Sequence, residues 1–517
     1  MENSILSLLP PVLALVMVIF TRRVLLSLGV GIIVGALMIN DFSIVASIGQ
    51  IASIVGAVFV VDGALNTWEL YILFFLLLLG MMASLIALSG GSRAFGDWAI
   101  RRVKTRVGAQ LVTVLLGILI FIDDYFNSLT VGNVSRPLTD RHKISRSKLA
   151  YLVDSTAAPM CVIAPLSSWG AYIITIIGGI LVTHGVTQYE PLQAFLFMVP
   201  MNFYAIIALL LVVAVAVFKL DLGAMKTHEE RAMKTGEVVD PNKGAIPGEQ
   251  DTISENKHGK VRDLVLPILA LIVGTVYFMI HTGIQASGEE ATLLSIFENT
   301  DVATALLYGG VIGLIVALLL TALNKVNAQD IGVGLWAGIK SMLPAIYILL
   351  FAWTIIEIID GLGTGTYLAG LVSEHMNIAF LPAVIFILAG FMAFSTGTSW
   401  GTFAMLLPIA GEIAAVVDVE MMLPALAAVL AGAIFGDHCS PISDTTILSS
   451  TGAGSHHIDH VITQLPYALI VAGITFVSYL VLGFTGSMLI GLVAAIILFV
   501  IVVAVLKRLV GAKAANA

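Results

Sequence analysis

The stretch AIFGDHCSPISDTTILSS, residues 433–450, places two aspartates, a histidine and several hydroxyl side chains between two apolar runs. An ionised carboxylate at membrane depth costs at least about 2.5–3.5 kcal/mol, so such a residue is a functional hypothesis by default. Gly436 and Pro441 predict a broken or unwound helix, and one helix face holds both aspartates if the break is mild. His438 fits a proton carrier on the ion path, and it fits a hydrogen-bonded interior histidine equally well. The predicted cation- or proton-binding residues of this stretch are Asp437, Ser440, Asp444 and Thr445.

The rest of the 517-residue chain is as apolar as the flanks of this stretch. Hydrophobic residues make up 59% and charged residues only 11%, and the mean hydropathy is +1.02. Soluble domains carry about a quarter charged residues. The composition therefore excludes a soluble or disordered protein and predicts an all-α polytopic membrane protein with about 10–12 transmembrane helices. A net charge of −8 gives no support for nucleic-acid binding, and two cysteines form neither a disulfide framework nor a zinc cluster.

A polar, charged segment at residues 221–263 interrupts the apolar blocks and shows no helical periodicity. We predict a flexible cytoplasmic linker here, between an N-terminal membrane repeat (1–220) and a C-terminal membrane repeat (264–510). Lys and Arg also cluster at 22–23, 93–106, 136–148 and 507–513, which places these segments on the cytoplasmic side.

The basic clusters make two predictions about topology. Residues 108–133 lie between two clusters but are too few for two full spans at about 1.5 Å per residue. A re-entrant hairpin that turns near Asp123 and Asp124 is the simplest solution. Residues 42–61 are ambiguous, because counting them as a span puts Arg23 and Arg93 on opposite sides. Either this segment is interfacial or the boundaries are misjudged.

The predicted hairpin tip, FIDDYFNS at residues 121–128, has two adjacent carboxylates that need a cation, a partner or a proton. Hard cations take several oxygen ligands, and the neighbouring amide and hydroxyl supply neutral oxygens. A solvated loop at the membrane surface is the competing interpretation. The predicted cation- or proton-binding residues are Asp123, Asp124, Asn127 and Ser128.

A third polar site is YLVDSTAAPM, residues 151–160. Pro159 is expected to interrupt the helix and to free a backbone carbonyl near Ser155. Alternatively, Asp154 caps a helix that begins there. The predicted cation- or proton-binding residues are Asp154, Ser155 and Thr156.

The two halves resemble each other faintly. PMCVIAPLSSWGA (159–171) and PISDTTILSSTGA (441–453) match without a gap at a proline, at Leu-Ser-Ser and at Gly-Ala. Polar breaks precede both, at 123–128 and 395–399, and paired breaks of this kind indicate a midplane transport site between structural repeats. Further residues of the substrate or ion path are predicted to be Ser167, Ser168, Ser399 and Glu357, the last of which is equally well an interface residue.

Three other patterns predict no site. His456, His457 and His460 are expected in a solvated loop, because a closed zinc site needs four ligands. The G-x-S-x-G pattern at 397–401 lacks the strand–turn–helix context of a hydrolase. Two membrane aspartates alone do not make an intramembrane protease. We therefore predict that the protein is not an enzyme and needs no organic cofactor.

Three motifs carry a resemblance to a known family. FIDDYFNSLTVG (121–132), DSTAAP with PLSSWG (154–170) and GDHCSPISDTT (436–446) resemble the NhaC family of bacterial Na⁺/H⁺ antiporters, within the ion-transporter superfamily. The resemblance implies a multi-pass secondary transporter of the bacterial inner membrane, with inverted repeats and hairpins. Members differ in cargo: some exchange Na⁺ for H⁺, and others exchange malate for lactate or move amino acids.

Two functions remain open from the sequence. The first is Na⁺/H⁺ antiport, with a sodium ion at the aspartate cluster and competition between Na⁺ and H⁺ for one carboxylate site. The second is a Na⁺- or H⁺-coupled carrier of an amino acid or small organic acid, bound at half-helix N-termini. A channel is a weaker candidate, because paired aspartates favour tight ion binding and a channel must release its ions quickly. The expected partners are Na⁺, H⁺ and the lipid bilayer, and a small organic solute and a homodimer are left open.

Overall fold

The computed structural model describes residues 4–21, 23–121, 124–165, 167–244, 256, 259–288, 292, 295–296, 299–364, 367 and 377–515. In this part of the chain, eight helices are long and apolar enough to cross a membrane, or nine with one bent pair. The prediction of an all-α polytopic membrane protein is confirmed. The sequence predicted 10–12 crossings because several apolar segments were counted as full spans. In the structure these segments form shorter apolar helices.

The first half contains eleven α-helices and one small hairpin within its described residues. The helices are α1 (Leu9–Thr21), α2 (Val24–Ile39), α3 (Ile44–Ala57), α4 (Thr67–Leu88), α5 (Gly91–Arg102), α6 (Arg106–Leu119), α7 (Asp124–Arg141), α8 (Arg146–Ile163), α9 (Ser168–Thr183), α10 (Pro191–Met198) and α11 (Phe203–Phe218). Strands β1 (Val60–Val61) and β2 (Ala64–Leu65) pair antiparallel between α3 and α4.

The linker and the second half follow the same pattern. Their α-helices are α12 (Gly223–Thr235), α13 (Arg262–Ser287), α15 (Val302–Leu323), α16 (Ala328–Gly361), α18 (Leu381–Thr396), α19 (Ser399–Val417), α20 (Met422–Cys439), α21 (Asp444–Ala453), α22 (His457–Thr485) and α23 (Met488–Ala515).

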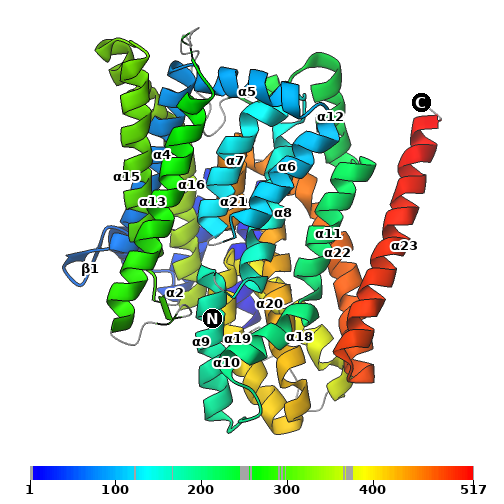
Figure 1. Ribbon diagram of the computed structural model, residues 1–517. Helices are drawn as coiled ribbons and strands as arrows, with labels where there is room; N and C mark the ends of the chain where they lie inside the picture. Colours follow the sequence, from blue (N-terminus) through cyan, green and yellow to red (C-terminus); the bar gives the residue numbers. More distant parts are fainter. Residues whose placement is uncertain are drawn as a thin grey trace.

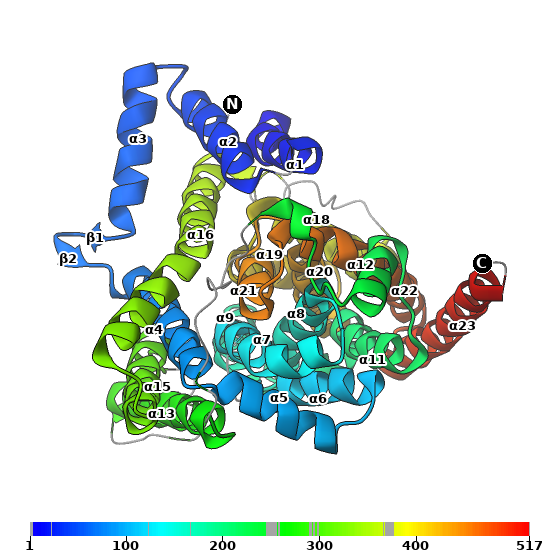
Figure 2. The ribbon, with the colours of Figure 1, turned by 90° about the horizontal axis from the view of Figure 1, so that it is seen from above.

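The helices pack in two groups that mix the halves of the sequence. Helices α4, α13, α15 and α16 stand together on one side, and α6–α11 with α18–α22 form the larger group (Figures 1 and 2). Each group has its own hydrophobic core. Helix α5 lies flat along the upper edge between them (Figure 1). That residues 1–220 and 264–510 are two membrane repeats stays a prediction.

Two hairpins enter the larger group from opposite ends. In Figure 1, α6 and α7 lie in the upper half of the molecule and α18 and α19 in the lower half. The second helix of the first hairpin begins at Asp124 and that of the other at Ser399, 275 positions later (399 minus 124). The re-entrant hairpin expected at 108–133 is therefore present, and it has a counterpart of opposite orientation.

Two broken helices accompany the hairpins, α8 with α9 and α20 with α21. Ser167 caps the N-terminus of α9 and Ser443 that of α21, 276 positions later (443 minus 167). The ungapped match of 159–171 with 441–453 has an offset of 282 positions (441 minus 159), so its register is wrong by six. The ungapped alignment pairs the two Leu-Ser-Ser motifs. In the structure, the corresponding positions of the two halves are the N-caps of α9 and α21.

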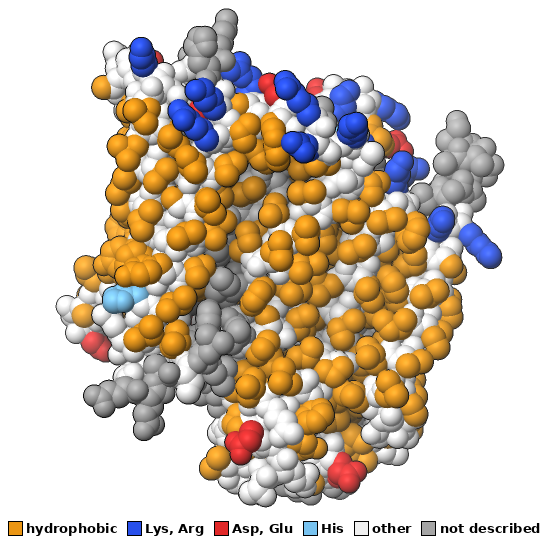
Figure 3. Space-filling view, in the orientation of Figure 1, with side chains coloured by type: hydrophobic (Ala, Val, Ile, Leu, Met, Phe, Trp, Pro, Cys, Tyr) orange, Lys and Arg blue, Asp and Glu red, His pale blue; other side chains and the backbone are white. Residues whose placement is uncertain are grey.

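Charge is distributed as the positive-inside rule requires. Lys and Arg lie along the upper edge in Figure 3, above a broad apolar belt, and that edge is the cytoplasmic side. Helix α3 bends by 120° from α2 and is seen lengthwise from above in Figure 2. Counted as one bent span, α2 and α3 together make one crossing and α4 makes the second, which puts Arg23 and Arg93 on the same side. This removes the ambiguity of residues 42–61.

The linker is ordered over its first third, so the expectation of a segment without helix is wrong there. Helix α12 carries Glu229, which is 2% exposed and accepts hydrogen bonds from Arg106 Nη2 at 2.6 Å and Ser145 N at 2.7 Å. Lys148, at the cytoplasmic end of α8, is 1% exposed and contacts Asp221 at 2.5 Å and Glu229 at 3.7 Å. Buried ion pairs, which local periodicity does not reveal, hold α12 against the bundle.

The end of the described linker contacts α22. In the short 3₁₀ turn Pro241–Lys243, the backbone N–H of Asn242 donates to Asp240 and lowers the pKa of that partly buried carboxyl. Lys243 forms an ion pair with Asp459, in the first turn of α22. The linker thus contacts the same helix that carries part of the candidate site.

Candidate ion-binding site

Four buried aspartates from both halves lie in or beside the hairpin and the broken helices. They are Asp124 at the start of α7, Asp154 within α8, Asp437 in the last turn of α20 and Asp444 at the start of α21, and each is at most 6% exposed. Carboxylates this deep need donors, a cation or a proton.

The break between α20 and α21 follows directly from its sequence. Ser440 ends α20, and its Oγ donates to Phe394 O of α18 at 2.8 Å. Pro441 follows, and Ser443 Oγ then accepts from Thr446 N at 3.2 Å as the N-cap of α21. The predicted break is confirmed, but it is a full one, so the two aspartates do not share one helix face.

Thr445 connects these two aspartates. Its Oγ1 donates to Asp437 Oδ2 at 2.7 Å, and its backbone N donates to Asp444 Oδ1 at 2.8 Å. Tyr125 OH, from α7, donates to Asp444 Oδ2. The other oxygen of Asp437, Oδ1, is buried and has no hydrogen-bond partner among the residues that the structure describes. Asp437 therefore keeps an open acceptor in a fully enclosed position.

Four polar side chains from α21 and α22 contact the carboxylate of Asp154. Its Oδ1 accepts from Ser449 at 3.2 Å, and its Oδ2 lies 3.3 Å from Thr446 Oγ1, 3.1 Å from His460 Nε2 and 2.5 Å from Gln464 Nε2. A carboxylate accepts about four hydrogen bonds. The expectation that Asp154 caps a helix does not hold, since α8 begins eight residues earlier at Arg146 and runs through Pro159 to Ile163.

Sequence reasoning missed the partners of Asp154 on α22. His457 and His460 are 6% and 0% exposed, so the expected solvated loop is wrong. His457 Nε2 lies 2.7 Å from Pro441 O, at the helix break. Only a weak signal marked these residues: His460 and Gln464 are four apart at the start of an apolar run, and so share a helix face.

The α6–α7 hairpin is tied to its own break and to α21. Asn127 Nδ2 donates to Gly117 O at 2.6 Å and to Ile120 O at 2.7 Å, which satisfies carbonyls that the break leaves without helical partners. Its Oδ1 is buried without a partner within the described chain. Ser128 Oγ lies 3.1 Å from Ser449 Oγ, so the predicted residues of the hairpin reach the donors of Asp154.

Other predicted residues contact the network at its edges. Asp124 Oδ1 accepts from Trp169 Nε1 at 2.9 Å. Ser155 and His438 line a small cavity with Tyr204, whose OH lies 3.2 Å from His438 Nδ1. Ser399, the first residue of α19, is 3% exposed.

Some predicted residues take structural roles instead. Thr156 Oγ1 donates to Leu152 O and Val153 O of its own helix, both at 2.9 Å. Ser167 Oγ bonds only to nearby backbone as the cap of α9. Glu357 is exposed on α16, which favours the interface interpretation over the ion path. Asp123 and the side chain of Ser168 lie outside the described residues.

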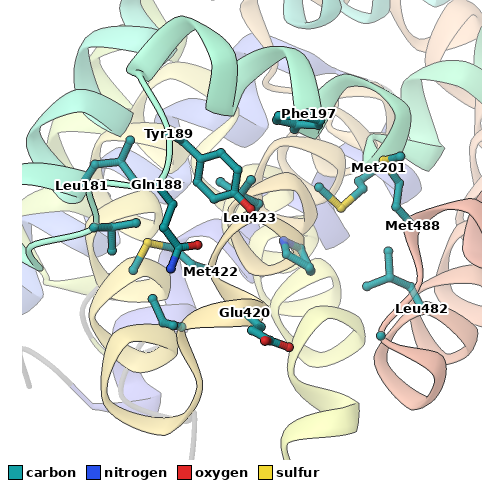
Figure 4. A pocket seen from close by; sticks show the side chains of 14 residues that line it. Leu181, Gln188, Tyr189, Phe197, Met201, Glu420, Met422, Leu423, Leu482 and Met488 are labelled. Carbon is teal, nitrogen blue, oxygen red and sulfur yellow. The ribbon is translucent and has the colours of Figure 1, made fainter.

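A separate cavity is shown in Figure 4, near α10 in the lower part of Figure 1. It encloses about 370 Å³ between α10, the start of α20 and the ends where α22 meets α23. Its lining is mostly apolar and includes Tyr189, Met201 and Met488. The carboxylate of Glu420 also lines it. None of the four aspartates of the network is in its lining.

The donor set of the network suits a hard monovalent cation. Within the described residues, no group of three or more His, Cys, Asp or Glu side chains has the geometry of a metal site. The oxygens around Asp437 and Asp444 come instead from carboxylates and hydroxyls, the ligands that hard cations prefer. Buried carboxylates at the breaks of membrane helices are typical of secondary transporters, and the fold belongs to that class.

Comparison with known proteins gives the family. A family model described as "Na+/H+ antiporter family" matches residues 160–484, and the chain belongs to this family. It is a multi-pass membrane transporter and not an enzyme.

Three relatives are informative in different ways. An uncharacterized protein of Haemophilus influenzae is 50% identical over 98% of this chain and 96% of its own length. An uncharacterized Na⁺/H⁺ antiporter of the same species is 33% identical over 27% of this chain and 31% of that protein. A malate-2H⁺/Na⁺-lactate antiporter of Bacillus subtilis is 32% identical over 33% of this chain and 36% of that protein. Of these three, the two with a named activity match 33% and 27% of this chain.

Proposed function

We propose that the protein exchanges Na⁺ for H⁺ across the bacterial inner membrane, with Asp437 and Asp444 as the site for which the two ions compete. The observation that carries this proposal is the open acceptor of Asp437, beside a second carboxylate that Thr445 connects to it. Two neighbouring carboxylates in a low-dielectric site need a counter-cation. Either Na⁺ or H⁺ meets that need, and each excludes the other.

Asp154 has a different role in this proposal. Four side chains of α21 and α22 contact its carboxylate, three at Oδ2 and one at Oδ1, so we assign it to the framework that holds α21 and α22 in place. Exchange follows if the protein changes between inward-open and outward-open states only when Asp437 carries Na⁺ or H⁺. The paired hairpins from opposite sides give each state an equivalent barrier.

The test uses purified protein in sealed liposomes with a pH-sensitive dye inside. Na⁺ is added across an imposed pH gradient, then K⁺, with no organic solute present. We expect proton flux that requires Na⁺, and we expect Asp437→Asn to abolish it. Glu420→Gln is the matched control, because Glu420 is an exposed acid outside the aspartate network. Normal exchange by Asp437→Asn would remove that residue from the site, and absence of Na⁺-dependent flux in the wild type would refute antiport.

A Na⁺- or H⁺-coupled carrier of an organic solute is the second candidate. The observation that favours it is the similarity of 33% of the chain to the malate-2H⁺/Na⁺-lactate antiporter of Bacillus subtilis. An organic solute that restores flux in otherwise silent liposomes would establish this alternative.

A further inference from the structure

Helix α5 lies at the cytoplasmic edge and joins the two helix groups. Figure 1 shows it flat along the upper edge, and Figure 2 shows it with α6 at the periphery of the molecule. It packs against α4 and α13 of the smaller group and against α7 of the larger one. Phe95 is partly buried and packs against apolar residues of both groups. One side of α5 is therefore held by protein.

The outer side of α5 is aromatic and basic. Trp98, Arg101 and Arg102 are spaced three and four residues apart, so they share one face of the helix. Trp98 is 44% exposed, and its ring lies 5.5 Å from that of Phe95. Both arginines are exposed, and so is Lys104, two residues after the helix ends. These four residues, Trp98, Arg101, Arg102 and Lys104, form the α5 basic patch.

The positive charges of the α5 basic patch are not neutralised by ion pairs. Nearby charged groups have partners: Arg106 pairs with Glu229 at 2.6 Å, and Arg141 pairs with Asp97 at 3.4 Å. Within the described residues, no ion pair includes any of the three basic side chains of the patch. A partner with negative charge therefore gains three cationic contacts here without displacing a carboxylate of the protein.

The patch lies directly above a surface that faces lipid. Helix α6 begins at Arg106, two residues after Lys104, and carries Leu115 and Leu119, which are 53% and 61% exposed. Leu115 lies about 14 Å along the helix from Arg106, at 1.5 Å per residue. Lys and Arg side chains gather above the apolar belt in Figure 3, at the level where a bilayer has its headgroups. Tryptophan is enriched at this level, since its ring is apolar and its N–H is polar.

These features together identify the chemistry of a partner. Three adjacent cationic groups attract a phosphate, and the planar fork of an arginine matches its oxygens. An exposed indole and the leucines below it offer apolar contacts, which a phosphate ion in water does not use. A basic cluster on the cytoplasmic side of a membrane helix is typical of sites for anionic lipids.

We propose that the α5 basic patch binds an anionic phospholipid of the cytoplasmic leaflet. Arg101, Arg102 and Lys104 contact its phosphate, and the indole of Trp98 packs beside the upper part of its chains. The bound lipid then holds in place the helix that joins the two groups. This site does not depend on which ions the protein exchanges, and it is measured without transport.

The test follows quenching of tryptophan fluorescence in the purified full-length protein in detergent, titrated with dibrominated phosphatidylglycerol. The chain has six tryptophans, so the signal of Trp98 is taken as the difference between each protein and its Trp98→Phe form. We expect saturable quenching of Trp98 by this lipid. Dibrominated phosphatidylcholine, which has no net charge, should need a concentration about tenfold or more higher. High salt should weaken the binding of phosphatidylglycerol by screening.

Two triple variants locate the binding. Arg101→Gln with Arg102→Gln and Lys104→Gln is expected to weaken binding of phosphatidylglycerol about tenfold or more. The matched control removes three other exposed charges of the cytoplasmic side, by Lys226→Gln, Lys234→Gln and Arg262→Gln, and should bind like the wild type.

The outcomes separate this proposal from the proposed antiport. Equal quenching by the two lipids, equal binding by the two triple variants, or full displacement of the lipid by an equal concentration of inorganic phosphate overturns the lipid site, even if Na⁺/H⁺ exchange is intact. Weaker binding by the patch variant alone supports the site even if liposomes show no Na⁺-dependent flux, in which case only the antiport proposal fails.

Discussion

Helices α7 and α21 cross at two glycines, and Gly132→Ala tests that crossing. A Cβ at Gly132 would lie 2.5 Å from the carbonyl carbon of Gly452 and 2.8 Å from the N of Ala453. Both atoms are backbone, so no side-chain rotation relieves the overlap. Ordinary contact begins at about 3.4 Å, so the helices would have to separate by about 0.9 Å (3.4 minus 2.5).

The expected cost follows from overpacking. Forcing an extra methyl into a packed crossing costs about 1–3 kcal/mol. Alanine also gains about 1 kcal/mol over glycine in helix propensity, which opposes this cost. Gly179→Ala isolates the two effects, because Gly179 is exposed on α9 and a Cβ there meets nothing within 4 Å. We therefore expect the two variants to differ by about 1–3 kcal/mol, with Gly132→Ala the less stable.

The assay is thermal unfolding of the purified protein in detergent, followed by tryptophan fluorescence with and without Na⁺. Separation of α7 from α21 also pulls Ser449 away from Ser128, a contact of 3.1 Å, so Na⁺-driven flux should fall as well. If Gly132→Ala melts at the same temperature as Gly179→Ala or above it, with normal flux, the close crossing does not constrain the site and this reasoning is wrong.

Three further predictions concern the buried polar contacts. Glu229→Ala should lower stability by about 1.5–3 kcal/mol, because it removes the acceptor of Arg106 and of the backbone N–H of Ser145 while Lys148 keeps Asp221; a shift in melting temperature no larger than that of a surface substitution would contradict this. Lys243→Ala should cost at most about 1 kcal/mol, since the side chain is 29% exposed, and the charge swap of Lys243 with Asp459 should restore the melting temperature. Gln464→Ala should destabilise the protein by about 1.5–3 kcal/mol by taking a donor from a buried carboxylate, and unchanged thermal unfolding would argue against the contact.

The sequence predicted the breaks well because their causes are local. Pro441 has no backbone N–H to donate within a helix, and serine side chains compete with the backbone for hydrogen bonds. A break near residue 440 can therefore be predicted from the sequence. Pro159 carried a weaker form of the same signal, and there packing kept α8 intact for four more residues. A proline inside a membrane helix is tolerated where neighbours satisfy the freed carbonyl.

Contacts between distant segments could not be predicted in the same way. Asp154 and His460 are 306 residues apart, and no local pattern decides which face of α22 meets α8. Apolar residues lie on several sides of α22, so the periodicity of its sequence does not predict which way its histidines face. Helix α12 was missed for a related reason, since ion pairs with α6 and α8 hold it and its own sequence is polar.

The long reach of these contacts has a consequence for biogenesis. When α8 leaves the ribosome, His460 and Gln464 have yet to be synthesised, and at about 5–20 residues per second they follow roughly 15–60 s later. During that interval, Asp154 has none of its α21 and α22 donors. The contacts of Asp154 can therefore be completed only after α22 has been made, so the core of the site forms late in synthesis or after it.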